Sequence, residues 1–175
     1  MSRNKSSSPV GFAGRFVVGF LLLTGAFEAS RGTAFERFIV EDVILAPTRD
    51  LINLVMPNDH VALVDRTFAS PGATLHITRG CEGIEMFLML VAAILAVPAT
   101  WKQRLWGLAI GSLIAYALSV ARLTVLYYIL RHAPGAWESM HGLVLPLAPI
   151  IGIALFFLRW STTSTREAAS ATRAA

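Results

Sequence analysis

Four apolar runs, each long enough to cross a bilayer, constrain this chain more than any other feature of its sequence. They cover approximately residues 10–29, 84–100, 105–130 and 143–160. A transmembrane helix needs about 20 mostly apolar residues. With 175 residues, of which 55% are hydrophobic and 15% charged, the chain has more apolar surface than a small soluble domain can bury. We therefore expect an all-α polytopic membrane protein with about four transmembrane helices.

The charge and the reactive side chains exclude several other classes. The net charge is +4, but the basic residues are scattered rather than gathered in a stripe, so we expect no nucleic-acid partner. Cys81 is the only cysteine, which excludes an internal disulfide framework and a cysteine-based zinc site. His60, His76 and His132 have no metal-ligand spacing. We therefore expect neither a metal nor a cofactor.

Basic residues flanking the apolar runs predict the orientation, because cytoplasmic loops are enriched in Lys and Arg. The turn at residues 101–104 is the most informative, since short loops follow this rule best. One side of the membrane carries Arg3, Lys5, Arg15, Lys102, Arg104, Arg159, Arg166 and Arg173. We expect a cell (inner) membrane protein with a membrane-embedded domain at residues 10–160, a cytoplasmic tail at 1–9 and a disordered cytoplasmic tail at 161–175.

The first span has an alternative interpretation as a cleaved signal peptide. Thr24-Gly25-Ala26 is an acceptable cleavage site. Phe27 and Glu28 follow at once and the apolar run is not compact, so a retained span is the favoured interpretation.

Residues 30–83 form an outer loop too long to be a simple connection. Between Glu36 and Met56 the apolar residues recur with helical spacing, interrupted by Pro47, which predicts short helices. Residues 61–68 and 73–78 are rich in β-branched side chains and flank the turn sequence Ser-Pro-Gly. This pattern predicts a β-hairpin.

Three reactive residues are predicted to lie at one depth, near the outer boundary of the membrane. Cys81 precedes the second span and His141 precedes the fourth. Arg122 comes late in the third span, about 25 Å above Leu105 in a hydrocarbon layer of about 30 Å. Residues far apart in the sequence are therefore expected to meet.

Each of the three also has a structural interpretation. The thiol of Cys81 lies near a helix N-terminus and Arg79, which favours the nucleophilic thiolate, but a lone cysteine is often a small buried apolar residue. Arg122 is expected to face the interior of the helix bundle. There it has either a functional role or a structural one, in which it balances the charge of Glu85. His141 could be a general base or merely an interfacial polar residue.

The three motifs in order resemble those of the exosortase/archaeosortase family. They are Cys81-Glu82-Gly83-Ile84, Ser119-Val120-Ala121-Arg122-Leu123 and Met140-His141-Gly142. The resemblance covers residues 61–160, including the strand-turn-strand run before the cysteine. Glu82 stands where many members have serine, and the spans are fewer than the eight or so of longer members. The chain therefore resembles a short, core-only form such as the exosortase H type.

The resemblance implies a membrane cysteine protease or transpeptidase that cleaves the C-terminal sorting tail of exported proteins at the outer face of the membrane. Its partners would be the lipid bilayer and exported proteins ending in a short motif, an apolar span and a basic end. Cys81 would be the nucleophile, His141 would move the proton, and Arg122 would stabilise the oxyanion or the thiolate.

The alternative is a non-catalytic assembly or scaffolding subunit of a secretion or polysaccharide-export system. In that case Cys81 serves packing, Arg122 neutralises Glu85, and the outer loop is the binding surface.

Overall fold

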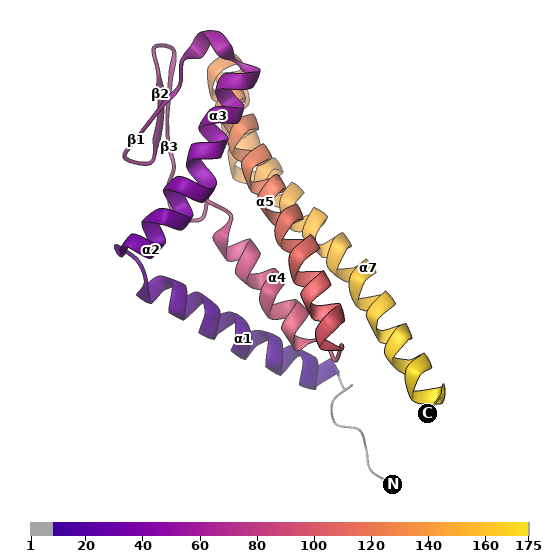
Figure 1. Ribbon diagram of the computed structural model, residues 1–175. Helices are drawn as coiled ribbons and strands as arrows, with labels where there is room; N and C mark the ends of the chain where they lie inside the picture. Colours follow the sequence, from indigo (N-terminus) through magenta and orange to yellow (C-terminus); the bar gives the residue numbers. More distant parts are fainter. Residues whose placement is uncertain (1–8, 175) are drawn as a thin grey trace.

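The computed structural model describes the backbone of residues 9–174 and the side chains of residues 10–164 (Figure 1). The predicted N-terminal tail therefore lies outside the described residues, except for its last residue. The helices are α1 (Pro9–Ala29), α2 (Ala34–Arg37), η2 (Phe38–Leu45), α3 (Ala46–Val55), η3 (Pro57–Asp59), α4 (Ile84–Ala96), α5 (Trp101–His132), η4 (Pro134–Ala136), α6 (Trp137–Ser139), η5 (Met140–Val144) and α7 (Leu145–Ala174). The strands are β1 (Ala62–Val64), β2 (Thr67–Ser70) and β3 (Ala73–His76).

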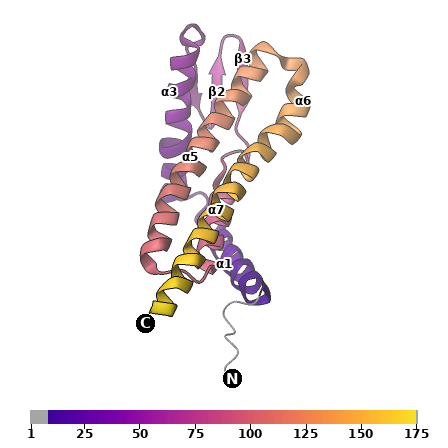
Figure 2. The same cartoon turned by 90° about the vertical axis from the view of Figure 1, so that its right-hand side faces the viewer.

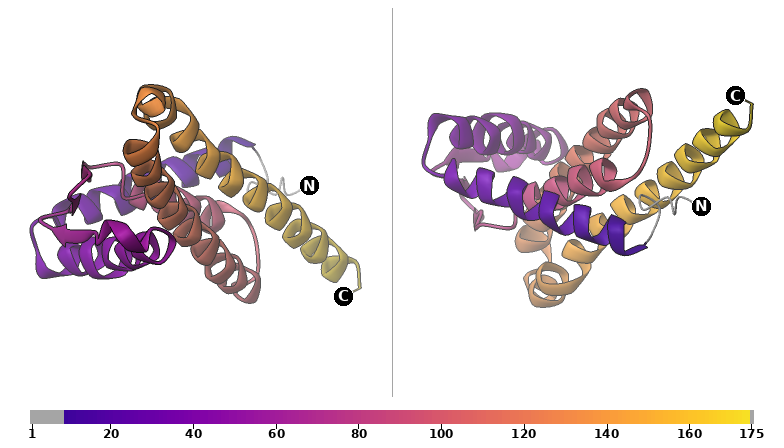
Figure 3. Two further views of the ribbon diagram at one scale, coloured as in Figure 1. Left: turned by 90° about the horizontal axis from the view of Figure 1, so that it is seen from above. Right: turned by 90° about the horizontal axis from the view of Figure 1, so that it is seen from below.

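The expected polytopic helical membrane fold is confirmed. Within the described part of the chain, three helical stretches are long and apolar enough to span a membrane: Val10–Ala29, Trp101–His132 and Pro134–Ser164. The second predicted span, at residues 84–100, is shorter than expected, because α4 has only 13 residues. Figure 3 shows α1 crossing α4 and α7 when the molecule is seen from below, and Phe12 stacks on Phe157 of α7.

The connection between α4 and α5 differs from the prediction for a physical reason. Val97 precedes Pro98 and has extended backbone angles, as residues before proline prefer, so α4 ends at Ala96 rather than at residue 100. Thr100 and Gln103 then form a reciprocal capping box that starts α5 at Trp101. The predicted turn at residues 101–104 is therefore the first turn of α5.

The predicted disordered tail at residues 161–175 is a further difference, since the backbone of α7 remains helical to Ala174. The hydroxyls of Ser161 and Thr162 donate to carbonyl oxygens three residues earlier, at Leu158 and Arg159. These bonds satisfy the hydroxyl groups within the helix, so the polar side chains do not end it. Alanines farther along have the highest helix propensity.

The long loop folds into a helical run and a small sheet. Helices α2, η2 and α3 follow one another without a break, and Pro47 lies in the first turn of α3. The predicted β-hairpin is a three-stranded antiparallel sheet in the order β1-β2-β3. Phe68 of β2 pairs with Leu63 of β1 and Leu75 of β3. The first predicted strand is thus divided by a turn at Asp65 and Arg66.

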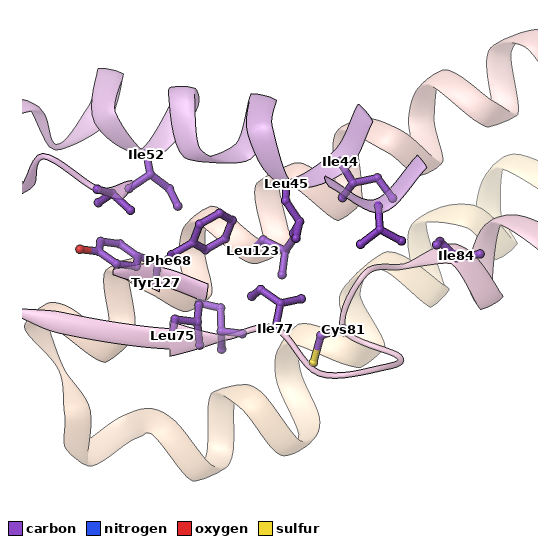
Figure 4. Close-up of a cluster of buried hydrophobic side chains, with 13 residues drawn as sticks. Ile44, Leu45, Ile52, Phe68, Leu75, Ile77, Cys81, Ile84, Leu123 and Tyr127 are labelled. Carbon is purple, nitrogen blue, oxygen red and sulfur yellow. The ribbon is translucent and has the colours of Figure 1, made fainter. Parts of the chain in front are cut away.

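Two apolar cores stack along α5. One contains Met86, Leu90, Ile94, Ala115 and Ile153, which join α4, α5 and α7. The other joins the sheet and the α2–α3 run to the second half of α5 (Figure 4). Figures 1 and 2 show α3 alongside that half of α5. The loop from β3 to α4 lies where the two cores meet.

Polar contacts fasten the sheet to α5. The hydroxyl of Tyr127 lies 2.7 Å from Ser70 Oγ and 3.2 Å from Asp59 Oδ2, so its single proton can be donated to either oxygen. Asp59 also forms an ion pair with Arg131 at 3.3 Å. The strand that leads to Cys81 is therefore part of a layer fixed on α5.

Candidate active site

The structure brings the three predicted site residues to one cavity. Cys81, Arg122 and His141 all line a cavity of about 440 Å³. They come from the β3–α4 loop, from α5 and from η5, so three segments distant in sequence converge there. Apolar residues of α1, α4 and α7, among them Phe20 and Ile150, complete the walls.

Cys81 lies in a tight turn just before α4. Its backbone N–H donates to the carbonyl oxygen of Thr78 at 3.1 Å, and its Sγ lies 3.6 Å from Thr78 Oγ1. The residue is 9% exposed and its thiol is free. Figure 4 shows the sulfur at the edge of the apolar core, on the loop between β3 and α4. The thiol is thus held by its own turn and reached through the cavity.

Two glycines shape this loop. Gly80 and Gly83 have φ of +82° and +83°, which L side chains rarely adopt. Gly83 also packs directly on α5, because a Cβ built there would overlap Ser119 Oγ and lie 3.0 Å from Ser119 Cβ. The loop therefore approaches α5 as closely as a backbone can.

Arg122 faces the bundle as the small-residue stripe predicted. Gly111, Ala115 and Ser119 are buried, and Arg122, one turn farther on, is half-buried. Among the described residues, no hydrogen bond or ion pair joins the guanidinium to another side chain, and Glu85 is not its partner. A cationic group with unused donors thus lines the cavity.

His141 is held by an aromatic neighbour. Its ring stacks on that of Trp137, with the centroids 5.0 Å apart and the planes 8° from parallel. It belongs to the π-helical segment η5, where the backbone passes into α7. Such π-helical turns are frequent at functional sites. Trp137 was not among the residues predicted from the sequence, although a spacing of four residues from a histidine on a helix indicates contact.

The depth of the loop can be worked out along α5. Gly83 packs on Ser119, which lies about 21 Å above Leu105 at 1.5 Å per residue. Arg122 lies about 25 Å above Leu105 by the same measure. If the hydrocarbon layer begins at Leu105, the cavity lies in the half of the layer nearer the sheet, within its thickness of about 30 Å.

The family comparison matches the same part of the chain. Residues 12–160 match the family described as "Transmembrane exosortase (Exosortase_EpsH)". The chain belongs to the transmembrane exosortase family. No curated protein and no solved structure matches it.

Glu82 is a residue of this exosortase whose environment the sequence did not reveal. Its side chain is 3% exposed and lies 3.8 Å from a guanidinium nitrogen of Arg66. Burial raises the pKa of the Glu82 carboxyl, Arg66 and Arg31 oppose the rise, and the carboxylates of Glu36 and Glu85 add to it. The sequence showed only an acidic residue where many members have serine.

A second cavity of the exosortase, of about 340 Å³, has almost entirely apolar walls. Phe27, Phe87 and Tyr116 contribute aromatic rings to it. Gly83 lines both cavities. A segment of the Cys81 loop therefore lies between a cavity that carries ionisable side chains and an almost entirely apolar one.

Proposed function

We propose that this protein is a membrane cysteine protease or transpeptidase that cleaves the C-terminal sorting tail of exported proteins at the outer face of the cell membrane. The observation that carries the proposal is the convergence of Cys81, Arg122 and His141 on one cavity. Membership of the exosortase family supports the same chemistry.

The reaction follows from the groups at the cavity. The thiolate of Cys81 attacks the carbonyl carbon of the scissile peptide bond; a C–S bond forms and the C–N bond breaks. His141 takes the thiol proton and gives it to the leaving amine. The thioester is then attacked by water, which completes proteolysis, or by an amine, which completes transpeptidation; either step restores the thiol.

Arg122 supplies the positive charge that this reaction needs. The carbonyl oxygen becomes an oxyanion during attack, and a fixed cation in a site of low polarity stabilises it strongly. Arg122 has no partner among the described side chains, so its donors remain available for that oxygen. Its planar guanidinium can hold an oxyanion at two points.

The proposed substrates are exported proteins that end in a short motif, an apolar span and a basic segment. The span would pack against the helices of the enzyme within the bilayer, with the scissile bond at the outer boundary. The apolar cavity beside the Cys81 loop supports this substrate class, because it offers aromatic and aliphatic walls to apolar side chains near that bond.

The non-catalytic alternative assigns Arg122 to the neutralisation of Glu85. That ion pair is not present among the described residues. An unpaired arginine and a free cysteine on one cavity favour the enzyme over the scaffold.

Replacement of the nucleophile tests the proposal. Each variant is co-expressed with a candidate substrate carrying the three-part tail, and processing is followed by gel mobility. Cys81→Ala should abolish processing and Cys81→Ser should nearly do so, because a hydroxyl is far less acidic than a thiol. Thr124→Ala is the matched control, since its hydroxyl only bonds the carbonyl of Val120 on α5. Full processing by Cys81→Ala would favour the scaffold.

A further inference from the structure

Arg66 lies among three carboxylates that come from three different segments. Its Nη2 is 2.8 Å from Glu36 Oε1 in α2, and its Nε is 3.2 Å from Glu41 Oε1 in η2. Its Nη1 is 3.8 Å from Glu82 Oε1. Glu82 is the residue after Cys81, so this cluster connects the helical run, the sheet and the loop that carries the thiol.

Two of the three carboxylates of this cluster are buried, and that of Glu41 is partly exposed. The side chains of Glu36 and Glu82 are each 3% exposed, and that of Arg66 is 25% exposed. A buried carboxylate without a cation is strongly unfavourable. Arg31, the other nearby cation, is bound to Glu28. Arg66 is therefore the cation that acts most strongly on both Glu36 and Glu82, and Arg31 contributes less.

The backbone at Arg66 points to a requirement for this side chain. Asp65 and Arg66 form the turn between β1 and β2 with φ of +45° and +59°. Asn, Asp or Gly is usual at the first position of such turns and Gly at the second, so Arg66 is the unusual residue. The backbone carbonyl of Arg66 also accepts a hydrogen bond from the N–H of Ile77, which lies next to the Thr78–Cys81 turn. The ion pairs of the Arg66 guanidinium with the three carboxylates explain why an arginine occupies this unfavourable backbone conformation.

We propose that Arg66 is a positioning residue, which holds the Cys81 loop by binding Glu82 and thereby keeps the thiol at the cavity. The loop has glycines with positive φ at residues 80 and 83, so its backbone has conformational freedom on both sides of Cys81 and Glu82. The contact between Glu82 and Arg66 restricts that freedom. This inference rests on the proposed function only for its catalytic consequence.

Alkylation of the only cysteine provides a test that needs no substrate. The second-order rate of reaction with iodoacetamide is measured on the purified full chain in detergent micelles. Arg66→Met and Glu82→Leu should each raise the rate about tenfold, because the loop opens and exposes a thiol that is 9% exposed in the native loop. Arg66→Lys should lie between Arg66→Met and the wild type, since lysine keeps the charge but loses the planar fork.

The control and the second variant keep the test decisive. Arg49→Met removes a cation of α3 that pairs with the exposed Asp50, and it should leave the rate unchanged. Arg66→Met removes the ion pairs of two buried carboxylates and so endangers folding, whereas Glu82→Leu spares the bonds of Arg66 to Glu36 and Glu41. Tryptophan fluorescence confirms folding in each case.

Processing assays separate this inference from the proposed function. Glu82→Leu should lower kcat about 10- to 100-fold with little change in KM, because a misplaced nucleophile reacts slowly with substrate that still binds. Wild-type alkylation rates and kcat in Glu82→Leu would overturn the positioning role while leaving the enzyme intact. Processing by Cys81→Ala would overturn the enzyme while leaving the alkylation result intact.

Discussion

Substitution of Gly83 by alanine tests how the Cys81 loop is packed. Two separate penalties apply. The residue has φ of +83°, which costs about 1–2 kcal/mol for an alanine. The new Cβ would also overlap Ser119 Oγ and lie 3.0 Å from Ser119 Cβ, and such overpacking costs about 1–3 kcal/mol. We therefore expect Gly83→Ala to lower the free energy of unfolding by about 2–5 kcal/mol.

Gly80→Ala is the matched control, because it carries the first penalty without the second. Gly80 has φ of +82°, and the nearest atom to a Cβ there is Glu85 Oε2 at 3.4 Å, the end of a flexible side chain. We expect a loss of only about 1–2 kcal/mol. The difference between the two variants measures the close approach of the loop to α5.

The assay is unfolding in dodecyl maltoside micelles by titration with dodecyl sulfate, followed by the fluorescence of the four tryptophans. Repeating Gly83→Ala in a Ser119→Gly background removes the overlapping atoms, so about 1–3 kcal/mol should be recovered relative to that background. The reasoning is refuted if Gly83→Ala is no less stable than Gly80→Ala, or if its loss is the same in both backgrounds.

Three further predictions concern the cavity and the buried carboxyl. Arg122→Lys should give a folded protein with little processing, because lysine loses the two-point grip on the oxyanion, whereas Arg159→Lys, on the exposed part of α7, should process normally in the gel assay. His141→Ala should slow processing by about 10²–10⁴-fold. His132→Ala should not, because the His132 ring packs at a tilt of 41° against Tyr128, outside the residues that line the cavity. The pKa of Glu82 is raised in the folded protein, so folding favours the protonated carboxyl. The stability that this carboxyl contributes is present at acid pH and is lost as pH rises from the ordinary glutamate pKa through the raised pKa of Glu82. Glu82→Gln cannot ionise and should therefore remove this loss, which sets in above the ordinary glutamate pKa of about 4, from the pH dependence of unfolding. A wild-type pH dependence in this variant would contradict the cause assigned.

The convergence of the site was predictable because helix geometry fixes depth. Each residue of a helix adds about 1.5 Å, so the positions of Cys81, Arg122 and His141 along their spans already placed them near one level. The buried face of α5 was equally predictable, since Gly111, Ala115 and Ser119 recur at four-residue spacing. These are local regularities that sequence spacing expresses directly.

The remaining features depend on contacts that spacing does not express. The turn between β1 and β2 has the usual Asp at its first position but Arg66 in place of Gly at its second, so the local signal for dividing the first predicted strand was incomplete. It is explained only by carboxylates such as Glu36, thirty residues away along the chain. The four-residue spacing of Trp137 and His141 indicates that their rings can stack. That this stacking orients a side chain of the cavity depends on the other segments that form the cavity.

The short length of α4 explains why the thiol lies inside the protein. Its 13 residues rise about 20 Å, whereas the 32 residues of α5 beside it rise about 48 Å. Because Pro98 ends α4 and the cap at Thr100 starts α5 almost at once, the connection adds little height. The N-terminus of α4 therefore lies far below the opposite end of α5, and the sheet and α3 pack against the part of α5 that extends beyond it. If α4 had full length, Cys81 would lie closer to that end of α5. The short α4 instead leaves Cys81 at the level of Ser119 and Arg122, where residues of α5 and α7 line the cavity.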